Sequence, residues 1–313
     1  MPIVNTDIPI TAESCQQMIR QLADSYPFCR TEVIGTSVYG RPISALIIGG
    51  GKRKVLYSAA HHANEWITAL VLLKFAEELA QAIATREKIF GISGFSIDQA
   101  ATIYIVPMVN PDGVDLVNGA LAPDSAEYEN ARQLSQNYPA IAFPQGWKAN
   151  LAGVDLNLQY PAGWLQAREI KFSQGYTRPG PRDYVGIAPF SQPESRSLAG
   201  YTDYVDPALV LAYHSQGQVI YWQFQDYYVP EARALGEEFA RLSGYALEDT
   251  PYESAFAGYK DWFIKKFRRP GYTVEVGQGE NPLPLEQFDE IYRDNLGILV
   301  AAALGTPISA PQS

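Results

Sequence analysis

Histidine and cysteine are both scarce in this chain of 313 residues, which contains three histidines and two cysteines. Cys15 and Cys29 are too few for a disulfide framework, so we expect reduced, structural thiols. No apolar run is long enough to cross a bilayer, which argues against membrane insertion. Residues 1–7 also lack the basic start and apolar stretch of a secretory signal, and we therefore expect a cytoplasmic protein.

Basic residues are outnumbered as well, because the formal net charge is −10. Nucleic acid is therefore an improbable partner, since phosphate binding needs a surplus of lysine and arginine. The cluster Lys265, Lys266, Arg268 and Arg269 is short and indicates a solvated surface. With 47% hydrophobic residues the chain has ample material for a core. The length allows one or two domains, and we expect a single domain over residues 1–313, with the oligomeric state left open.

Strand and helix patterns alternate along the chain. They predict an α/β fold, a mixed, mostly parallel sheet flanked by helices. Thr11 and Ser14 are both plausible caps of a helix that runs to about Ser25. Further helices are expected over residues 65–82, 193–204, 230–242 and 285–303, and strands over 41–48, 54–59, 102–109, 209–213, 219–224 and 272–276. The polar segment from 116 to 190 is rich in Tyr, Pro and Gly and predicts long functional loops.

Two of the histidines, His61 and His62, directly follow the strand pattern of residues 54–59. Glu65 lies three residues beyond His62, where a helix begins, so both side chains can reach one ion. His214 ends another strand, and ligands of open α/β sheets lie beyond the carboxyl ends of strands. Two imidazoles and a carboxylate form a catalytic zinc site. A hydrogen-bonded structural histidine is the alternative, and His-x-x-Glu alone is common by chance.

Glu275 stands in the middle of the apolar strand pattern of residues 272–276. Burying an unpaired charge is costly, so such a carboxylate is usually either paired or functional. A zinc hydrolase needs a general base close to its water molecule. Glu275 is the candidate for that base, and a paired structural carboxylate is the alternative.

Several ordered segments resemble those of the zinc metallocarboxypeptidases, the carboxypeptidase A family, over about residues 8–305. They comprise residues 34–37 with 40–43, 62–68, 106–114, 153–157, 214–215 and 272–275. The resemblance implies a carboxypeptidase A-like fold and one Zn²⁺ ion bound by His62, Glu65 and His214. It also implies that Glu275 is the general base and acid, and it leaves His61 without a direct role.

The same resemblance suggests two further catalytic residues. Lys148 follows Trp147 at the place where the family has a cation for the developing oxyanion. Tyr252 is the best match for the family's mobile tyrosine that caps the substrate, although its spacing to Asp261 is one residue longer than expected. A surface lysine and one of 20 unrelated tyrosines are the respective alternatives.

The chain departs from the family's exopeptidases at Asn157 and Leu158. Those enzymes hold the substrate's terminal carboxylate with an Asn-Arg pair, and leucine can neither donate a hydrogen bond nor balance that charge. Residues 157–164 instead resemble a bacterial branch, the γ-D-glutamyl-L-diamino acid endopeptidases. These cut between γ-D-glutamate and meso-diaminopimelate or lysine in murein peptides. Lys148 and Asn64, the latter at a position usually held by arginine, also fit that branch.

Lys260 precedes Asp261, and by resemblance it lies at the bottom of the specificity pocket. A partly buried ammonium favours a negatively charged partner, and diaminopimelate has a carboxylate at the end of its side chain. We therefore expect Lys260 to bind that carboxylate, with Asn157 and Asn64 as further substrate-binding residues. A lysine turned to solvent is the alternative.

The sequence thus predicts a zinc endopeptidase that acts on murein-derived peptides. A zinc carboxypeptidase with an unusual terminal residue and a non-catalytic cell-wall peptide-binding protein are the alternatives. A serine hydrolase is disfavoured because the chain has no Gly-x-Ser-x-Gly segment. Metalloproteases of the His-Glu-x-x-His type are excluded because that motif is absent.

Overall fold

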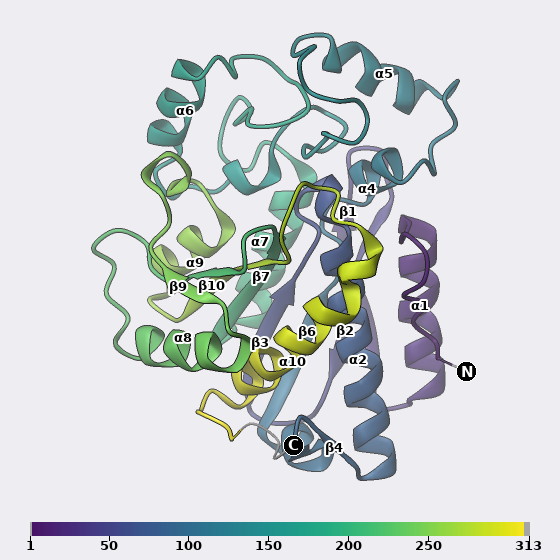
Figure 1. Ribbon diagram of the computed structural model, residues 1–313, viewed down its shortest axis with the longest axis vertical. Helices are drawn as coiled ribbons and strands as arrows, with labels where there is room; N and C mark the ends of the chain where they lie inside the picture. The colour runs from purple at the N-terminus through teal and green to yellow at the C-terminus, as the bar shows by residue number, and fades with distance from the viewer. Residues whose placement is uncertain (1, 310–313) are drawn as a thin grey trace.

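The computed structural model describes residues 2–309, and within them an eight-stranded sheet lies between layers of helices (Figure 1). In the order of their hydrogen bonding, the strands are β1 (Arg30–Thr36), β2 (Pro42–Ile48), β6 (Ala101–Val106), β3 (Arg53–Ser58), β7 (Leu209–Ser215), β10 (Gly271–Val276), β8 (Val219–Tyr221) and β9 (Ala246–Glu248). The central strands β6, β3, β7 and β10 are parallel, and antiparallel pairs flank them. The predicted mixed, mostly parallel sheet is confirmed. A separate small hairpin pairs β4 (Lys88–Ile89) with β5 (Ile92–Ser93).

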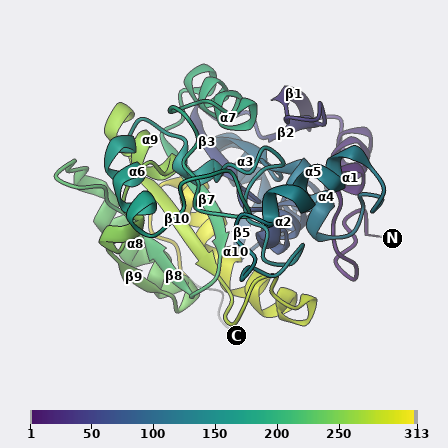
Figure 2. The same cartoon turned by 90° about the horizontal axis from the view of Figure 1, so that it is seen from above.

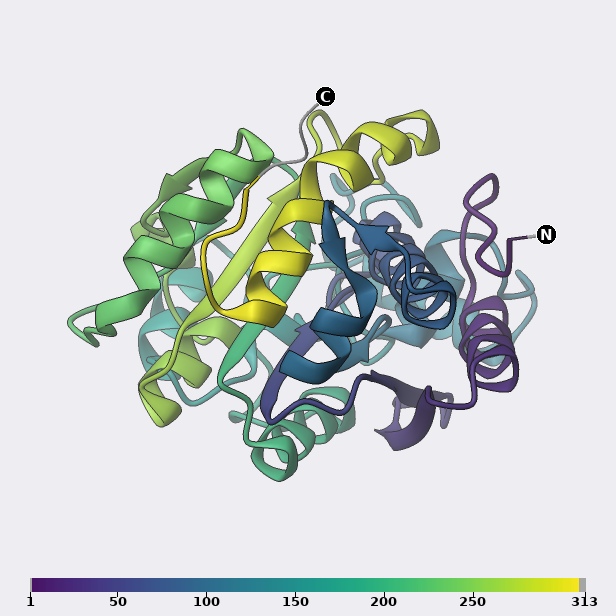
Figure 3. The same ribbon diagram turned by 90° about the horizontal axis from the view of Figure 1, so that it is seen from below.

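Helices cover both faces of this sheet. The helices within residues 2–309 are α1 (Ala12–Ser25), α2 (Ile67–Thr85), α3 (Gly94–Ala100), α4 (Pro111–Val117), α5 (Ala126–Ser135), α6 (Trp164–Ser173), α7 (Pro193–Val205), α8 (Pro230–Ser243), α9 (Tyr259–Phe267) and α10 (Phe288–Leu304). Short 3-10 turns occur at η1 (Ala63–Glu65), η2 (Leu156–Leu158), η3 (Tyr252–Ser254) and η4 (Leu285–Gln287). Seen from below, α2, α8 and α10 lie on one face of the sheet and α7 on the other (Figure 3). None of the helices in residues 2–309 combines the length and hydropathy that crossing a membrane requires.

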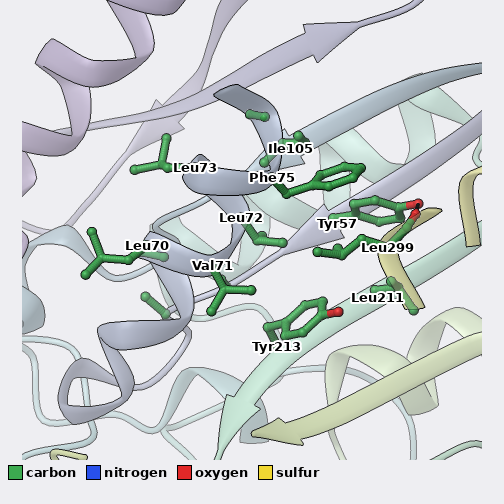
Figure 4. Packing of buried hydrophobic residues seen from close by; sticks show 14 of the residues in the cluster. Tyr57, Leu70, Val71, Leu72, Leu73, Phe75, Ile105, Leu211, Tyr213 and Leu299 are labelled. Carbon is green, nitrogen blue, oxygen red and sulfur yellow. Dashed lines mark hydrogen bonds between the residues drawn. The ribbon is translucent and has the colours of Figure 1, made fainter. Parts of the chain in front are cut away.

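The central strands are apolar on both sides because both sides are covered. Successive side chains of a strand point to opposite faces, so Leu211 and Tyr213 of β7 join the layer under α2 and α10. Val210 and Ala212 of the same strand join the layer under α7 and α9. In the first layer, Tyr57 packs beside side chains of α2 and α10, and its hydroxyl donates to the carbonyl of Leu299 at 2.8 Å (Figure 4). Such two-sided burial explains the continuous apolar runs of the sequence.

Most predicted elements are present with shifted ends. Thr11 is the N-cap of α1, while Ser14 completes a capping box by accepting a hydrogen bond from the Thr11 amide at 2.9 Å. The helix expected from Glu65 begins instead at Ile67, because residues 63–65 form the turn η1. The strand predicted over 219–224 ends at Tyr221.

The segment from 116 to 190 was predicted as long loops and is only partly irregular. It contains α5 and α6, whose polar faces give weak apolar patterns. Viewed from above, this segment crosses the end of the sheet toward which the central parallel strands run (Figure 2). The end of the sheet is therefore covered by a segment whose apolar residues follow no long periodic pattern.

Candidate metal centre and active site

Three buried side chains, those of His62, Glu65 and His214, meet at the carboxyl ends of β3 and β7. One ligand atom from each lies within 4.8 Å of the others. The Nδ1 atoms of His62 and His214 are 3.2 Å apart, and each is 2.9 Å from an oxygen of Glu65. Two imidazole nitrogens and a carboxylate that face one another are the donor set of a catalytic zinc site. The three residues therefore fit a zinc ion.

The turn η1 explains how residues three apart in sequence converge. The Glu65 amide donates to the His62 carbonyl at 3.2 Å, which closes the turn. Thr68 fastens both ends, because its hydroxyl accepts from the Ala60 amide at 3.0 Å and donates to the Glu65 carbonyl at 2.7 Å. The backbone thus presents both side chains on the same side.

Asp155 orients one of these imidazoles, and no sequence pattern assigned it this role. Its carboxylate lies 3.0 Å from Nε2 of His62. A carboxylate on the second ring nitrogen fixes the tautomer that leaves Nδ1 free for a metal. Burial by itself raises the pKa of Asp155, but His62, Lys148 and Lys171 together outweigh burial, so the pKa lies below its ordinary value. The carboxylate therefore stays ionised.

Glu275 reaches the same site from β10. In the parallel pairing of β10 and β7, Glu275 lies opposite His214, so both side chains point to the same face. Burial raises the pKa of Glu275 to about 8, and the negative charge of Glu65 adds to the increase. A carboxyl group with such a pKa can hold or release a proton near neutral pH.

Lys148 lies beside the ligand glutamate. Its Nζ is 2.9 Å from Oε1 of Glu65. Burial lowers the pKa of Lys148, but the negative charges of Glu65, Asp155 and Glu275 together outweigh burial and raise the pKa above its ordinary value. The backbone fixes its position, since the Lys148 amide donates to the carbonyl of Pro181 at 2.8 Å. A permanent positive charge thus lies next to Glu65.

Two adjoining cavities open onto Lys148 and Glu275. The Leu158 cavity is lined by Leu158, Asn157, Lys260 and further polar residues. The Asn64 cavity is lined by Asn64 and by residues 140–142, 145–146, 215–216 and 279–281, among others. Both are bordered by the same four side chains, those of Lys148, Arg182, Tyr221 and Glu275. These four side chains therefore mark the junction of the two cavities.

The predicted substrate-binding residues Asn157 and Lys260 both line the Leu158 cavity. The side-chain oxygen of Asn157 accepts from the Tyr259 amide at 3.0 Å. The ammonium of Lys260 donates to the carbonyl of Gln223 at 2.6 Å and lies 2.5 Å from a carboxylate oxygen of Asp261. Much of the charge on Lys260 is therefore balanced within the protein.

Asn64 lines one of the two cavities, whereas Tyr252 lines neither. The Asn64 amide donates to the Gln145 carbonyl at 3.3 Å, while its buried oxygen has no hydrogen-bond partner within residues 2–309. Tyr252 is 67% exposed, and its ring packs against Phe256 with 5.3 Å between the centroids. Its neighbours Thr250 and Ser254 line the Leu158 cavity, but Tyr252 does not. Tyr252 therefore stands at the rim in this conformation.

His61 lies behind the ligands. Its Nε2 is 2.9 Å from the Ser58 hydroxyl, and its ring centroid is 5.0 Å from that of His214. Sequence reasoning also missed Lys171, Arg182 and Asp183, three charged residues of the Leu158 cavity. They come from the segment over the sheet, where no periodic pattern indicates which side chains face inward.

The sequence of the chain is similar to those of known peptidases. Residues 15–297 match the family model described as zinc carboxypeptidase. The γ-D-glutamyl-L-diamino acid endopeptidase 1 of Lysinibacillus sphaericus is 44% identical over 284 residues, which cover 90% of this chain and 69% of that protein. An uncharacterised protein of Bacillus subtilis is 39% identical over 91% of this chain and 74% of its own length.

Solved structures share the fold at lower identity. The carboxypeptidase A of Helicoverpa armigera superposes with a TM-score of 0.68 at 18% identity, covering 96% of this chain and 75% of its own. The helix-flanked sheet is therefore the carboxypeptidase A-like fold. Together with the matched family model and the facing His, Glu and His side chains, these findings show that the chain belongs to the zinc carboxypeptidase family of metallopeptidases.

Proposed function

We propose that this chain hydrolyses the amide bond between γ-D-glutamate and a diamino acid in murein-derived peptides. The observation that carries the proposal is Leu158, which lines the cavity beside Asn157 where the family's exopeptidases have arginine. An aliphatic side chain offers nothing to a terminal carboxylate, so a free C-terminus is not required at this place. The 44% identical relative, which is named as an endopeptidase of this specificity, supports the same substrate class.

We assign the metal site to one zinc ion held by His62, Glu65 and His214. When bound, zinc acts as a Lewis acid that lowers the pKa of water and polarises a carbonyl oxygen. Glu275 takes the proton of the attacking water and passes it to the leaving amine. Lys148 donates a hydrogen bond to the carbonyl oxygen as negative charge develops there. Both side chains border the junction of the two cavities, which supports these roles.

We also propose that Lys260 binds the side-chain carboxylate of diaminopimelate. Its ammonium donates one hydrogen bond, to the Gln223 carbonyl, and lies beside Asp261, which leaves N–H groups for a ligand. Lys260→Ala should reduce the preference for diaminopimelate over lysine peptides. An unchanged preference, measured as a ratio of kcat/KM values, would rule out this role. Asn157, Asn64 and Tyr252 complete the proposed substrate contacts.

The peptide L-Ala-γ-D-Glu-meso-diaminopimelyl-D-Ala separates endopeptidase from carboxypeptidase activity. An endopeptidase yields two dipeptides, whereas a carboxypeptidase releases D-Ala. Amidating the C-terminus should leave the first reaction intact, because Leu158 does not engage that end. Release of D-Ala, or loss of cleavage on amidation, would refute the proposed function. A non-catalytic binding protein would produce neither product.

A further inference from the structure

Four cationic side chains line the Leu158 cavity, and three of them are committed to acidic partners. The pairs are Lys148 with Glu65 at 2.9 Å, Lys171 with Asp183 at 2.7 Å, and Lys260 with Asp261 at 2.5 Å. All three lysine side chains are largely buried. Their charges are therefore mostly balanced before any substrate arrives.

Arg182 is the fourth cation, and it differs from the others. Its Nε lies 2.6 Å from Asp183, but that carboxylate is shared with Lys171. The terminal nitrogens Nη1 and Nη2 donate to no group within residues 2–309, and 42% of the side chain is exposed. The planar fork of a guanidinium matches a carboxylate through two parallel hydrogen bonds. Arg182 thus offers an unused, correctly shaped donor pair to the cavities.

Hydrogen bonds connect the backbone on both sides of Arg182 to residues of the active site. The carbonyl of Pro181 accepts from the amides of Lys148 and Ala149, both at 2.8 Å. On the other side, the Asp183 amide donates to Asp155 at 3.3 Å, the carboxylate that orients His62. A fixed backbone reduces the freedom that a residue loses when it binds a ligand. The backbone of Arg182 is held in this way, so that binding has to order the side chain alone.

Its place between the cavities indicates which part of the substrate it meets. Arg182 borders both cavities, together with Lys148 and Glu275. The scissile amide must lie beside Glu275, and the diamino acid takes the Leu158 cavity if Lys260 binds it. The acyl part of the substrate then extends into the Asn64 cavity. Among the described residues, Lys148 and Arg182 are the cations that line that cavity, and Lys148 is paired with Glu65.

We propose that Arg182 binds the free α-carboxylate of the γ-linked D-glutamyl residue on the acyl side of the scissile bond. A glutamyl residue joined through its side chain keeps this carboxylate, whereas one joined through its α-carboxyl group does not. Arg182 thereby selects γ-linked over α-linked substrates. Its positive charge lies on the acyl side of the scissile bond, and not at Leu158, where the family's exopeptidases have arginine. This inference rests on the proposed function and extends it to the acyl-side residue.

Two substrates test it on the wild-type protein. L-Ala-γ-D-Glu-meso-diaminopimelate is compared with the analogue whose glutamyl α-carboxylate is a carboxamide. Because the carboxamide loses the charge-assisted hydrogen bonds, the wild type should prefer the carboxylate by about 10- to 150-fold in kcat/KM, which corresponds to about 1.5–3 kcal/mol at 1.36 kcal/mol per tenfold. Cleavage of both peptides at equal rates would overturn the role of Arg182 and leave the proposed function intact. Cleavage of neither would overturn the proposed function and the inference with it.

Variants then assign the preference to this residue. Arg182→Ala should lower kcat/KM for the carboxylate peptide to near that of the carboxamide and so remove the preference. Arg182→Lys keeps the charge without the fork and should retain part of the preference, which provides a readout if the alanine variant does not fold. Arg178→Ala removes an exposed arginine of the same segment that lines neither cavity and should change nothing. A preference that persists in Arg182→Ala would contradict the proposal.

Discussion

Glu275 is the residue on which turnover is expected to depend most. Its strand partner His214 fixes it on the ligand face, and burial raises its pKa to about 8. Glutamine has the same shape but cannot accept a proton, so Glu275→Gln should lower kcat about 10²–10⁴-fold, the usual contribution of a general base. Zinc content measured by atomic absorption should be unchanged. A variant that keeps wild-type kcat would exclude Glu275 as the base.

Glu194 should make folding stability depend on pH. It is fully buried at the start of α7, where it accepts from the Val38 amide at 3.0 Å and from Asn150 at 3.1 Å. Burial raises its pKa to about 7, so the folded protein retains a proton that the unfolded chain has lost. The stabilisation is present at low pH and is lost as pH rises through about 7, by on the order of 3 kcal/mol.

Urea unfolding at pH 5 and pH 8 measures this effect. Glu194→Gln should be less sensitive to pH than the wild type, because its side chain does not titrate. Glu253→Gln replaces an exposed glutamate and serves as the matched control. If the wild type and Glu194→Gln lose the same stability between the two pH values, Glu194 is not the titrating group.

Several site residues could be predicted from the sequence, and others could not. His62, Glu65 and His214 could be predicted because they follow or end a strong strand pattern, and the carboxyl ends of parallel strands lie together. Asp155 and Arg182 lie in connections without periodicity, and only the fold shows that they turn inward. Their positions depend on contacts between distant segments, which local patterns do not encode.

At the level of elements, the accuracy follows the strength of the apolar pattern. The helix α2 and the strands β3 and β7 are buried on nearly every side, and their positions were predicted closely. In contrast, α5 has a single buried residue, Ala131, so its sequence resembles that of a loop. The strand predicted to reach Phe224 ends at Tyr221, because its pairings with β10 and β9 both end there, although Trp222 and Phe224 are aromatic.

The helix α1 offers a test of how one capping motif stabilises an element. The hydroxyl of Thr11 accepts from the Ser14 amide at 3.2 Å, and the Ser14 hydroxyl accepts from the Thr11 amide at 2.9 Å. Thr11→Ala removes one half of this box and should reduce the free energy of unfolding by about 1 kcal/mol. Thermal and urea unfolding measure the loss. Thr177→Ala, at an exposed position outside any helix, should be neutral, and equal losses in both variants would contradict the capping account.

On the scale of the whole molecule, one sheet brings together groups that are far apart in sequence. Parallel strands β3, β7 and β10 end at the same edge, which places His62, His214 and Glu275 side by side. The segment from 116 to 190 then covers that edge and adds Lys148, Asp155 and Arg182. The strands thus supply the proposed metal ligands and base, and the covering segment supplies the charges around the substrate.

Isotope labelling tests the central claim most directly. The zinc-loaded protein is incubated with L-Ala-γ-D-Glu-meso-diaminopimelate in H₂¹⁸O, and the products are identified by mass spectrometry. Hydrolysis at the proposed bond predicts L-Ala-D-Glu with one ¹⁸O in its γ-carboxyl group, together with unlabelled diaminopimelate. Label in free alanine, or an intact peptide under conditions where zinc is bound, would contradict the account.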